Sequence, residues 1–230
     1  TQVWQWLKNR VTLADGRTLL FAALKEGVSD IWSLDLETGA VTNLTRDEYA
    51  DNNPQVSPDG KLVVYERRIS GNAKVYAFPL GDPSRKTQLT FGPFDDTAPT
   101  FSTDGKKVYY SSNEDDDIPN LRSLDLQTGA IAQYTDVFGG AMAPAPLKTP
   151  HGDRLAFITY YKGEYLLLVE GFKFDPIPKL EIFRAANGKT PLHPEDPHIV
   201  ALATDRPFAS PLPQFDLNDH DAIAEFVLVH

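Results

Sequence analysis

The chain has 230 residues and a formal net charge of −10 at pH 7. That length allows one large domain or one domain with an extension, and 41% hydrophobic residues are enough to bury a core. The acidic balance argues against duplex nucleic acid or an anionic membrane surface as a partner, because both require clustered Lys and Arg. The absence of cysteine excludes disulfides, thiolate nucleophiles and zinc–thiolate sites. No apolar run approaches the roughly 20 residues of a membrane-spanning helix.

A repeat of about 45 residues organises the first two-thirds of the chain. Thr45, Thr90 and Thr135 keep this step. Two further landmarks keep the same register: the Asp-Gly pairs Asp15–Gly16, Asp59–Gly60 and Asp104–Gly105, and the prolines Pro54, Pro99 and Pro144. Because several independent landmarks share one register, we interpret them as an internal repeat.

Each repeat is predicted to contain four short β-strands. The runs Arg17–Ala22, Lys61–Glu66 and Lys107–Ser111 follow the Asp-Gly pairs and are rich in β-branched and aromatic residues. Asp-Gly between two such runs is a strong hairpin signal, because glycine accepts a positive φ without steric cost. Four strands in about 45 residues match one blade of a β-propeller. An all-β sandwich, the alternative, does not explain the repeated landmarks.

We therefore predict an all-β propeller domain over residues 1–170, with recognisable units near 9–52, 53–97, 98–142 and 143–170. Residues 171–230 contain eight prolines and are predicted to form a divergent fifth blade or an extended Pro-rich arm; the apolar run Ala222–Val229 is a candidate closing strand. Four units and a remnant must either close a small ring or be completed by blades outside this sequence, because an open propeller leaves sheet edges unpaired. The first residue, Thr1, suggests a processed form or a piece of a longer polypeptide.

The repeat resembles a known family. The segment Ser57–Lys61, followed by an apolar strand, by Val75-Tyr76 and by Leu89-Thr90, resembles the WD-like repeat of TolB-type propellers, and Ser102–Lys106 and Ala14–Arg17 are weaker copies. The resemblance covers about residues 9–170. It implies a periplasmic or otherwise extracytoplasmic location in the bacterial cell envelope. The same repeat occurs in the non-catalytic half of prolyl-oligopeptidase-like peptidases, so the fold alone does not give the function.

Catalytic and metal-binding motifs are weak or missing in the sequence. It contains no nucleophile elbow, zinc-peptidase helix or phosphate loop, so we expect no enzyme activity and no cofactor. Between His193 and His198 two prolines impose an extended backbone, which favours a solvated loop over a metal site. Asp216–Asp221 resembles a calcium loop only loosely, since it lacks the glycine and distal glutamate of an EF-hand.

The candidate binding surface is one face of the propeller. Strand direction alternates, so the loops between blades lie on the same face as the loops between second and third strands. The candidate partner-binding residues there are Tyr49, Phe94, Phe138, Asp95, Asp96, Arg67 and Arg68. Aromatic anchors within a charged rim are typical of protein-recognition surfaces. The alternative is that the aromatic rings only fill gaps between blades.

Two other features are candidates for binding. The acidic run that contains Asp115, Asp116 and Asp117 lies in a second-to-third-strand loop and is a possible calcium site. Trp4 and Trp6 alternate before the first repeat, which places both rings on one side of a strand as an edge packing or as an interface anchor.

The expected function is a non-catalytic, protein-binding propeller that acts as a scaffold or accessory subunit of a cell-envelope or membrane-associated complex. One alternative is the gating propeller of a larger TolB-like or prolyl-oligopeptidase-like peptidase whose catalytic part lies outside this sequence. A second is a propeller lectin or small-ligand binder, which would require a pocket with converging polar groups. We expect protein partners, no nucleic acid, and no membrane span in this chain.

Overall fold

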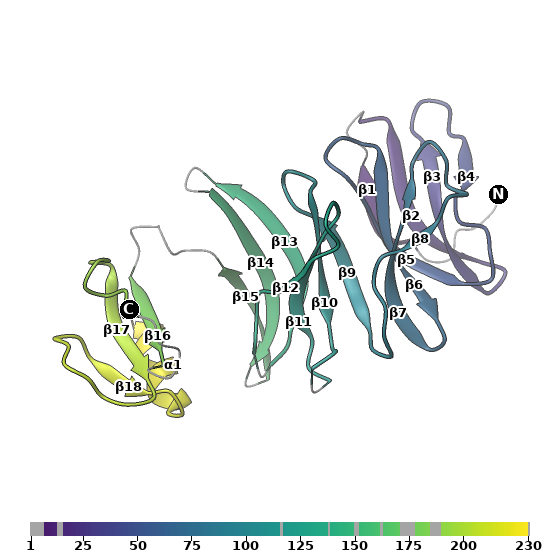
Figure 1. Ribbon diagram of the computed structural model, residues 1–230. Helices are drawn as coiled ribbons and strands as arrows, with labels where there is room; N and C mark the ends of the chain where they lie inside the picture. The colour runs from purple at the N-terminus through teal and green to yellow at the C-terminus, as the bar shows by residue number, and fades with distance from the viewer. Residues whose placement is uncertain are drawn as a thin grey trace. The chain divides into compact units, whose positions relative to one another are not determined.

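The computed structural model describes residues 7–12, 16–115, 117–137, 139–149, 152–161, 163–170, 178–184 and 190–229. The chain divides into two compact units, Thr1–Gly171 and Phe172–His230. The first unit is built from antiparallel sheets and the second from a parallel sheet (Figure 1). The boundary between the units falls where the sequence repeat fades.

The first unit contains successive antiparallel sheets whose strands pair in chain order (Figure 1). Blade 1 comprises β1 (Leu7–Thr12), β2 (Thr18–Lys25), β3 (Val28–Asp35) and β4 (Val41–Asn43), and blade 2 comprises β5 (Ala50–Val56), β6 (Leu62–Ile69), β7 (Asn72–Pro79) and β8 (Thr87–Gln88). Blade 3 comprises β9 (Asp96–Phe101), β10 (Lys107–Ser112), β11 (Asn120–Asp125) and β12 (Ile131–Gln133), and blade 4 comprises β13 (Ala141–Thr149), β14 (Gly152–Tyr161) and β15 (Glu164–Glu170). The predicted all-β fold with four-stranded blades is confirmed.

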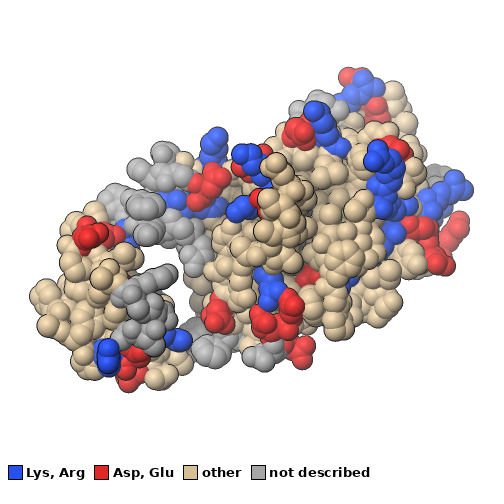
Figure 2. All heavy atoms as spheres, in the orientation of Figure 1, with Lys and Arg blue, Asp and Glu red and all other residues tan. Residues whose placement is uncertain are grey.

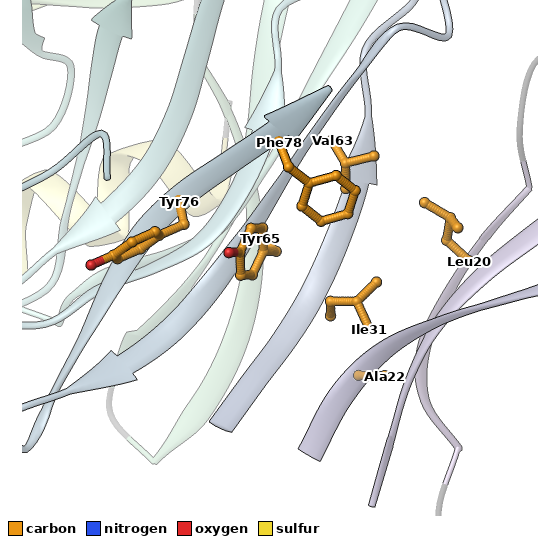
Figure 3. Close-up of a cluster of buried hydrophobic side chains, with 7 residues drawn as sticks. All are labelled: Leu20, Ala22, Ile31, Val63, Tyr65, Tyr76 and Phe78. Carbon is orange, nitrogen blue, oxygen red and sulfur yellow. The ribbon is translucent and has the colours of Figure 1, made fainter. Parts of the chain in front are cut away.

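The hydrophobic core lies between neighbouring blades. Ile31 of blade 1 belongs to the same buried cluster as Tyr65 and Phe78 of blade 2, and Figure 3 shows these side chains pointing toward one another. The rings of Tyr65 and Phe78 lie 5.4 Å apart in a tilted pair. A second cluster joins blades 2 and 3, and a third joins blades 3 and 4. Each blade therefore buries apolar side chains on the face that it turns to its neighbour.

The repeated threonines close the same corner in each of the first three blades. Each hydroxyl oxygen accepts the backbone N–H near the start of the third strand: Ile31 to Thr45 at 3.0 Å, Val75 to Thr90 at 3.0 Å, and Leu121 to Thr135 at 2.8 Å. The three threonines are buried. Because a buried N–H without a partner is costly, this bond explains why threonine recurs at this position of the repeat.

The repeated prolines mark a β-bulge in the first strand of blades 2, 3 and 4. The residues before them, Asn53, Ala98 and Ala143, have positive φ angles of 50°, 51° and 52°. The pairing register shifts at each of these points. Proline fits a bulge because it has no N–H to donate to the ladder. Glu66 ties two bulges together, since its Oε1 accepts the Asn53 side-chain amide and the backbone N–H of Ala98.

The Asp-Gly turns are held by a serine two residues before the aspartate. Ser57 Oγ donates to Asp59 Oδ1 at 2.6 Å and accepts the Leu62 N–H at 2.9 Å. Gly60 takes φ +74°, which glycine adopts without strain. The hydrogen bond from Ser57, followed by that from the Lys61 N–H, holds the pKa of Asp59 below its ordinary value. The equivalent turn at Ser102 and Asp104 has the same bonds and the same direction of pKa shift.

The second unit differs from the divergent blade and from the extended arm that the sequence suggested. β16 (Lys179–Phe183), β17 (Ile199–Thr204) and β18 (Gln214–Asp216) form a parallel sheet in that order. The prolines at 191, 194, 197, 207, 211 and 213 lie in the connections, so they leave the strand ladders intact. The candidate closing strand at 222–229 belongs instead to a helix.

That helix, α1 (His220–Val229), begins within the Asp216–Asp221 segment that resembled a calcium loop. Asp219 caps it, because its Oδ1 accepts the Ala222 N–H at 3.1 Å. Asp216 Oδ1 accepts the Asn218 N–H at 2.8 Å. These acidic residues therefore end a strand and start a helix.

Thr90→Val tests the role of the repeated threonine. Valine has nearly the same shape but leaves the buried Val75 N–H without an acceptor, so the free energy of unfolding should fall by about 1–3 kcal/mol. Urea denaturation of the full chain measures it. Thr87→Val, at an exposed site three residues away, is the matched control. Equal losses in both variants would contradict the proposed role.

Acid should destabilise the first unit through its turn aspartates. A carboxyl whose pKa is depressed by folding contributes stability above its unfolded value of about 3.9, and that stability is lost as the pH falls below it. We expect the urea midpoint to decline below about pH 4. The double variant Asp59→Asn, Asp104→Asn should show a shallower decline than the wild-type chain. Identical pH profiles would contradict this assignment.

Candidate protein-recognition face

One end of the first unit gathers the loops between blades with the turns between second and third strands, and we call this end the loop face. It comprises residues 44–49 and 89–95 together with turns at 26–27, 70–71, 113–115 and 117–119. Asp95 joins its own loop to the 113–115 turn and to the start of β7. Its N–H donates to Asn113 Oδ1 at 2.7 Å, and its Oδ1 accepts the Ala73 N–H at 2.6 Å. The loop that carries Phe94 and Asp95 thus lies beside the loop that contains the acidic run, as the alternation of strands predicted.

Arg67 of β6 lies at the centre of a buried ion-pair network below the loop face. Its Nε and Nη2 donate to the two carboxylate oxygens of Asp51, both at 2.8 Å, and Nη2 also donates to Asp47 at 2.6 Å. The guanidinium lies 4.9 Å from the centre of the Tyr49 ring. Lys86 Nζ completes the network 3.1 Å from Asp47. Only 6% of the Arg67 side chain is exposed, so it supports the loops from below.

The environment of Arg67 keeps it charged. Burial alone would lower its pKa, but the hydrogen bonds and charge of Asp51 more than offset this, and the net pKa lies above the ordinary arginine value. The rings of Tyr65 and Tyr76 lie 5.6 and 5.2 Å from the guanidinium and add cation–π contacts. Arg67 and Asp51 therefore form a bidentate pair with very little access to water.

A second buried pair joins blades 2 and 3. Lys74 Nζ of β7 lies 2.8 Å from Asp96 Oδ2 of β9, and the two side chains are 2% and 1% exposed. The Phe94 ring covers the ammonium group at 3.9 Å. Gly92 makes room for that ring, because a Cβ at this position would lie 2.3 Å from it, and its φ of +110° also favours glycine. Phe94 is consequently a packing residue of the blade junction.

Three carboxylates lie close enough together to suggest a cation site. Ligand atoms of Asp30, Asp47 and Asp51 lie within 4.8 Å of one another. However, Arg67 already bonds to two of them. Asp30 accepts the Asn43 side-chain amide at 2.8 Å and the Thr45 hydroxyl at 3.1 Å. Two cations of the chain, Arg67 and Lys86, and these hydrogen bonds therefore already occupy the cluster.

The predicted calcium loop also contacts a cation of the chain. Arg122 of β11 donates through Nη2 to Asp115 at 2.6 Å and through Nη1 to Glu114. Asp117 is exposed and has a positive φ of 59°. Asp116 lies outside the described residues. Calcium binding stays a prediction, and the arginine beside Asp115 does not favour it.

The structure distributes the other candidate residues over different environments. Tyr49 and Phe94 are half-buried over Arg67 and Lys74, so the alternative that these rings fill gaps fits their geometry. Arg68 is exposed and donates to the Gly71 carbonyl at 2.6 Å. Phe138, Trp4 and Trp6 lie outside the described residues.

Phe91 is an exposed aromatic residue that the sequence analysis did not select. It is 67% exposed and lies on the loop between blades 2 and 3. The equivalent positions of the neighbouring repeats are Arg46 and Asp136. A position that changes between arginine, phenylalanine and aspartate within a regular repeat does not serve the packing of the repeat. This variation in the sequence could have identified Phe91 as an exposed residue.

Charges of both signs are interspersed on the face shown in Figure 2. Figure 2 shows Lys and Arg side chains next to Asp and Glu side chains over the viewed face, without a large patch of a single sign. The buried pairs described above are not part of this surface. The viewed face does not offer, among the described residues, the basic stripe that a nucleic acid would require.

The repeats of the first unit resemble those of known propeller proteins. The profile described as "TolB beta propeller domain" matches residues 13–118. Residues 13–118 therefore carry repeats of the TolB propeller type. An uncharacterized protein of Agrobacterium fabrum, Atu1656, is 28% identical over 158 residues, which cover 65% of this chain and 54% of that protein. The crystal structure of TolB from Acinetobacter baumannii matches with a TM-score of 0.59 at 24% identity, over 70% of this chain and 40% of that chain, which shows the TolB-type fold.

A different family matches the end of the chain. The profile "Molybdopterin guanine dinucleotide synthesis protein B" matches residues 150–205. The molybdopterin-guanine dinucleotide biosynthesis adapter protein of Escherichia coli is 39% identical over 64 residues, which cover 27% of this chain and 37% of the adapter. The chain thus spans about half of one curated relative and about a third of the other. TolB-type repeats and an adapter-like segment follow one another in a single polypeptide.

Arg67→Met tests the buried network. The substitution leaves Asp51 buried without its cation. The free energy of unfolding should therefore fall by about 3–5 kcal/mol. Arg68→Met is the neighbouring exposed control and should change stability by less than about 0.5 kcal/mol. The double variant Arg67→Met, Asp51→Leu should recover part of the loss, because no unpaired carboxylate remains there. A loss unchanged by the second substitution would contradict the ion-pair account.

Proposed function

We propose that the TolB-type repeats form a non-catalytic, protein-binding propeller whose loop face contacts a partner in the bacterial cell envelope. The observation that carries this proposal is Phe91, a large aromatic side chain that is 67% exposed on a well-supported loop. Gly92 and the packing of Phe94 over Lys74 fix that loop. A rigid exposed aromatic residue is typical of interface anchors, because it loses little entropy on binding.

The charged rim of the loop face suits protein recognition. Arg68, Glu48 and Glu114 are exposed charged residues of the first unit. They can steer a partner of complementary charge toward the loop that carries Phe91. The described residues contain no helix that is long and apolar enough to cross a membrane. An extracytoplasmic location is proposed on the resemblance to TolB-type proteins, and a scaffold or accessory role in a larger assembly follows from it.

Site-specific photo-crosslinking tests this function. A photoreactive amino acid replaces Phe91 in the full chain, and in a matched control it replaces Leu36, which is 53% exposed in a turn at the opposite end of blade 1. In cell-envelope extracts of the source bacterium we expect one discrete adduct from position 91 and none from position 36. Arg68→Glu should weaken the adduct several-fold by changing the rim charge. Equal crosslinking from both positions, or none from position 91, would refute the loop-face proposal.

A second candidate function concerns the second unit, and the 39% identity to the E. coli adapter protein supports it. We infer that this unit contributes an adapter role in molybdopterin-guanine dinucleotide synthesis. Its core depends on Glu181, which is 9% exposed and accepts the backbone N–H groups of Leu192 and His193 at 2.6 and 2.9 Å.

Complementation tests that role. The full chain is expressed in E. coli that lacks its own adapter, and the cellular molybdopterin-guanine dinucleotide is measured. We expect partial restoration, which Glu181→Ala abolishes and Arg68→Met, an exposed change in the first unit, leaves unaltered. Failure to raise the dinucleotide content with well-folded protein would count against the role.

A further inference from the structure

Two cavities lie near the Asp-Gly turns, at the end of the first unit opposite the loop face. One, of about 400 Å³, lies between blades 2 and 3, and the other, of about 160 Å³, lies between blades 3 and 4. The turn at 102–105 separates them, because Asp104 and Gly105 line the first cavity and Thr103 lines the second. All the lining residues lie in the described parts of the chain. Neighbouring cavities on one surface can hold two side chains of a single extended ligand.

The larger cavity combines apolar walls with a carboxylate rim. Leu62 of β6 packs against the buried cluster that contains Phe101 of β9, and both residues line the cavity. Asp59 and Asp104 occupy equivalent places in the turns of blades 2 and 3 and line it as well. The cavity therefore offers an apolar surface that ends at two acidic groups.

The two carboxylates are only weakly engaged by cations of the chain. Oδ2 of Asp59 lies 3.9 Å from Lys61 Nζ, and Oδ2 of Asp104 lies 3.7 Å from Lys106 Nζ. The lysine side chains are 83% and 76% exposed, and ion pairs this exposed contribute little. The hydrogen bonds within the two turns hold the pKa of both carboxyls below the ordinary value. A cation that enters the cavity thus meets two ionised groups.

An arginine side chain matches this cavity. Its methylene groups can lie along Leu62 and Phe101 while the guanidinium reaches the carboxylates, as long basic side chains do at polar–apolar boundaries. The planar guanidinium forms paired hydrogen bonds with a carboxylate, which an ammonium group does not. A basic segment also complements a chain with a formal net charge of −10.

The smaller cavity is lined mainly by rings. Tyr109 and Tyr134 meet edge to face with their ring centres 5.3 Å apart, and Pro146 lines the same cavity. Thr103 donates its hydroxyl to Asp153 Oδ2 at 2.5 Å, so two polar residues of the lining already bond to each other. A volume of about 160 Å³ is below that of pockets for drug-sized ligands and suits a single ring. Proline provides such a ring, and aromatic-lined grooves bind it.

The step between blades sets the spacing of the two side chains. Packed sheets lie about 10 Å apart, and an extended chain advances about 3.3 Å per residue. Cavities at successive blade junctions therefore match side chains three residues apart. The proline also keeps the residue before it extended.

We propose that the turn end of blades 2–4 binds an extended segment of a partner protein with the pattern Arg-x-x-Pro. The arginine enters the cavity between blades 2 and 3, and the proline enters the cavity between blades 3 and 4. This inference goes beyond the loop-face proposal, because it places a second contact at the opposite end of the blades and names the chemistry of its ligand.

Fluorescence anisotropy with the full chain tests the proposal. The probe is fluorescein-labelled Ala-Arg-Ala-Ala-Pro-Ala, and the control peptides replace Arg with Glu, replace Pro with Ala, or place Pro directly after Arg. We expect the glutamate peptide to bind roughly tenfold more weakly than the probe. The other two should bind several-fold more weakly, because each leaves one cavity empty.

Matched variants separate the site from the stability of the fold. Asp104→Asn should weaken the probe several-fold. Asp125→Asn is the control, because Asp125 holds a turn of the same blade through the same kind of bonds but lines neither cavity. It should leave binding unchanged. Tyr134→Ala should remove the difference between the probe and the peptide without proline, whereas Ile131→Ala, at an exposed site nearby, should keep it.

Three results would overturn the proposal. Equal affinity for the arginine and glutamate peptides would show that the carboxylates do not select the ligand. An equal loss in Asp104→Asn and Asp125→Asn would assign the effect to stability. Loss of peptide binding in Phe91→Ala would place the peptide on the loop face. A failure of crosslinking from position 91 leaves peptide binding at the turn end unchanged, so the two proposals fail separately.

Discussion

The structure of the first unit depends on a buried carboxylate at each junction between described blades 1, 2 and 3. Asp51 and Asp96 are 45 residues apart, occupy equivalent places at the start of inner strands and are almost completely buried. An ionised carboxylate in such a place requires a cation and hydrogen bonds. The chain meets this need twice by different means: Asp51 pairs with Arg67 of its own blade, and Asp96 pairs with Lys74 of the preceding blade. The buried aspartate is therefore repeated in the two blades, whereas the cation that pairs with it is not.

The arrangement of the loop face follows from these pairs. Each buried cation needs a cover that excludes water without removing its charge, and an aromatic ring provides it: Tyr49 over Arg67 and Phe94 over Lys74. These rings hold the loops in place and so cannot also act as free anchors for a partner. Phe91 is the exposed aromatic residue of this loop, and it precedes Gly92, whose positive φ allows the loop to turn. Recognition and support are thus divided between two phenylalanines only three residues apart.

The sequence predicted the blades because their signals are local. Asp-Gly turns, the Thr corner and the Pro bulge each satisfy backbone groups within one repeat, so they recur at fixed spacing. The burial of Arg67 could not be predicted in this way, since it depends on Asp51, sixteen residues away across a strand pair. In the second unit the density of prolines concealed the strands between them. Ala222–Val229 is apolar enough for either a strand or a helix, and the cap from Asp219 decides for a helix.

β14 and β15 belong to blade 4 and also lie within the adapter-like match. The adapter-like match begins at residue 150 and continues into the second unit, whereas the two strands pair within the first unit. β14 alternates between buried residues such as Phe157 and exposed ones such as Ile158, as a blade strand with one covered face does. β15 has a continuous apolar run instead, which is typical of strands covered on both faces. In blade 4 it is more apolar than its position requires.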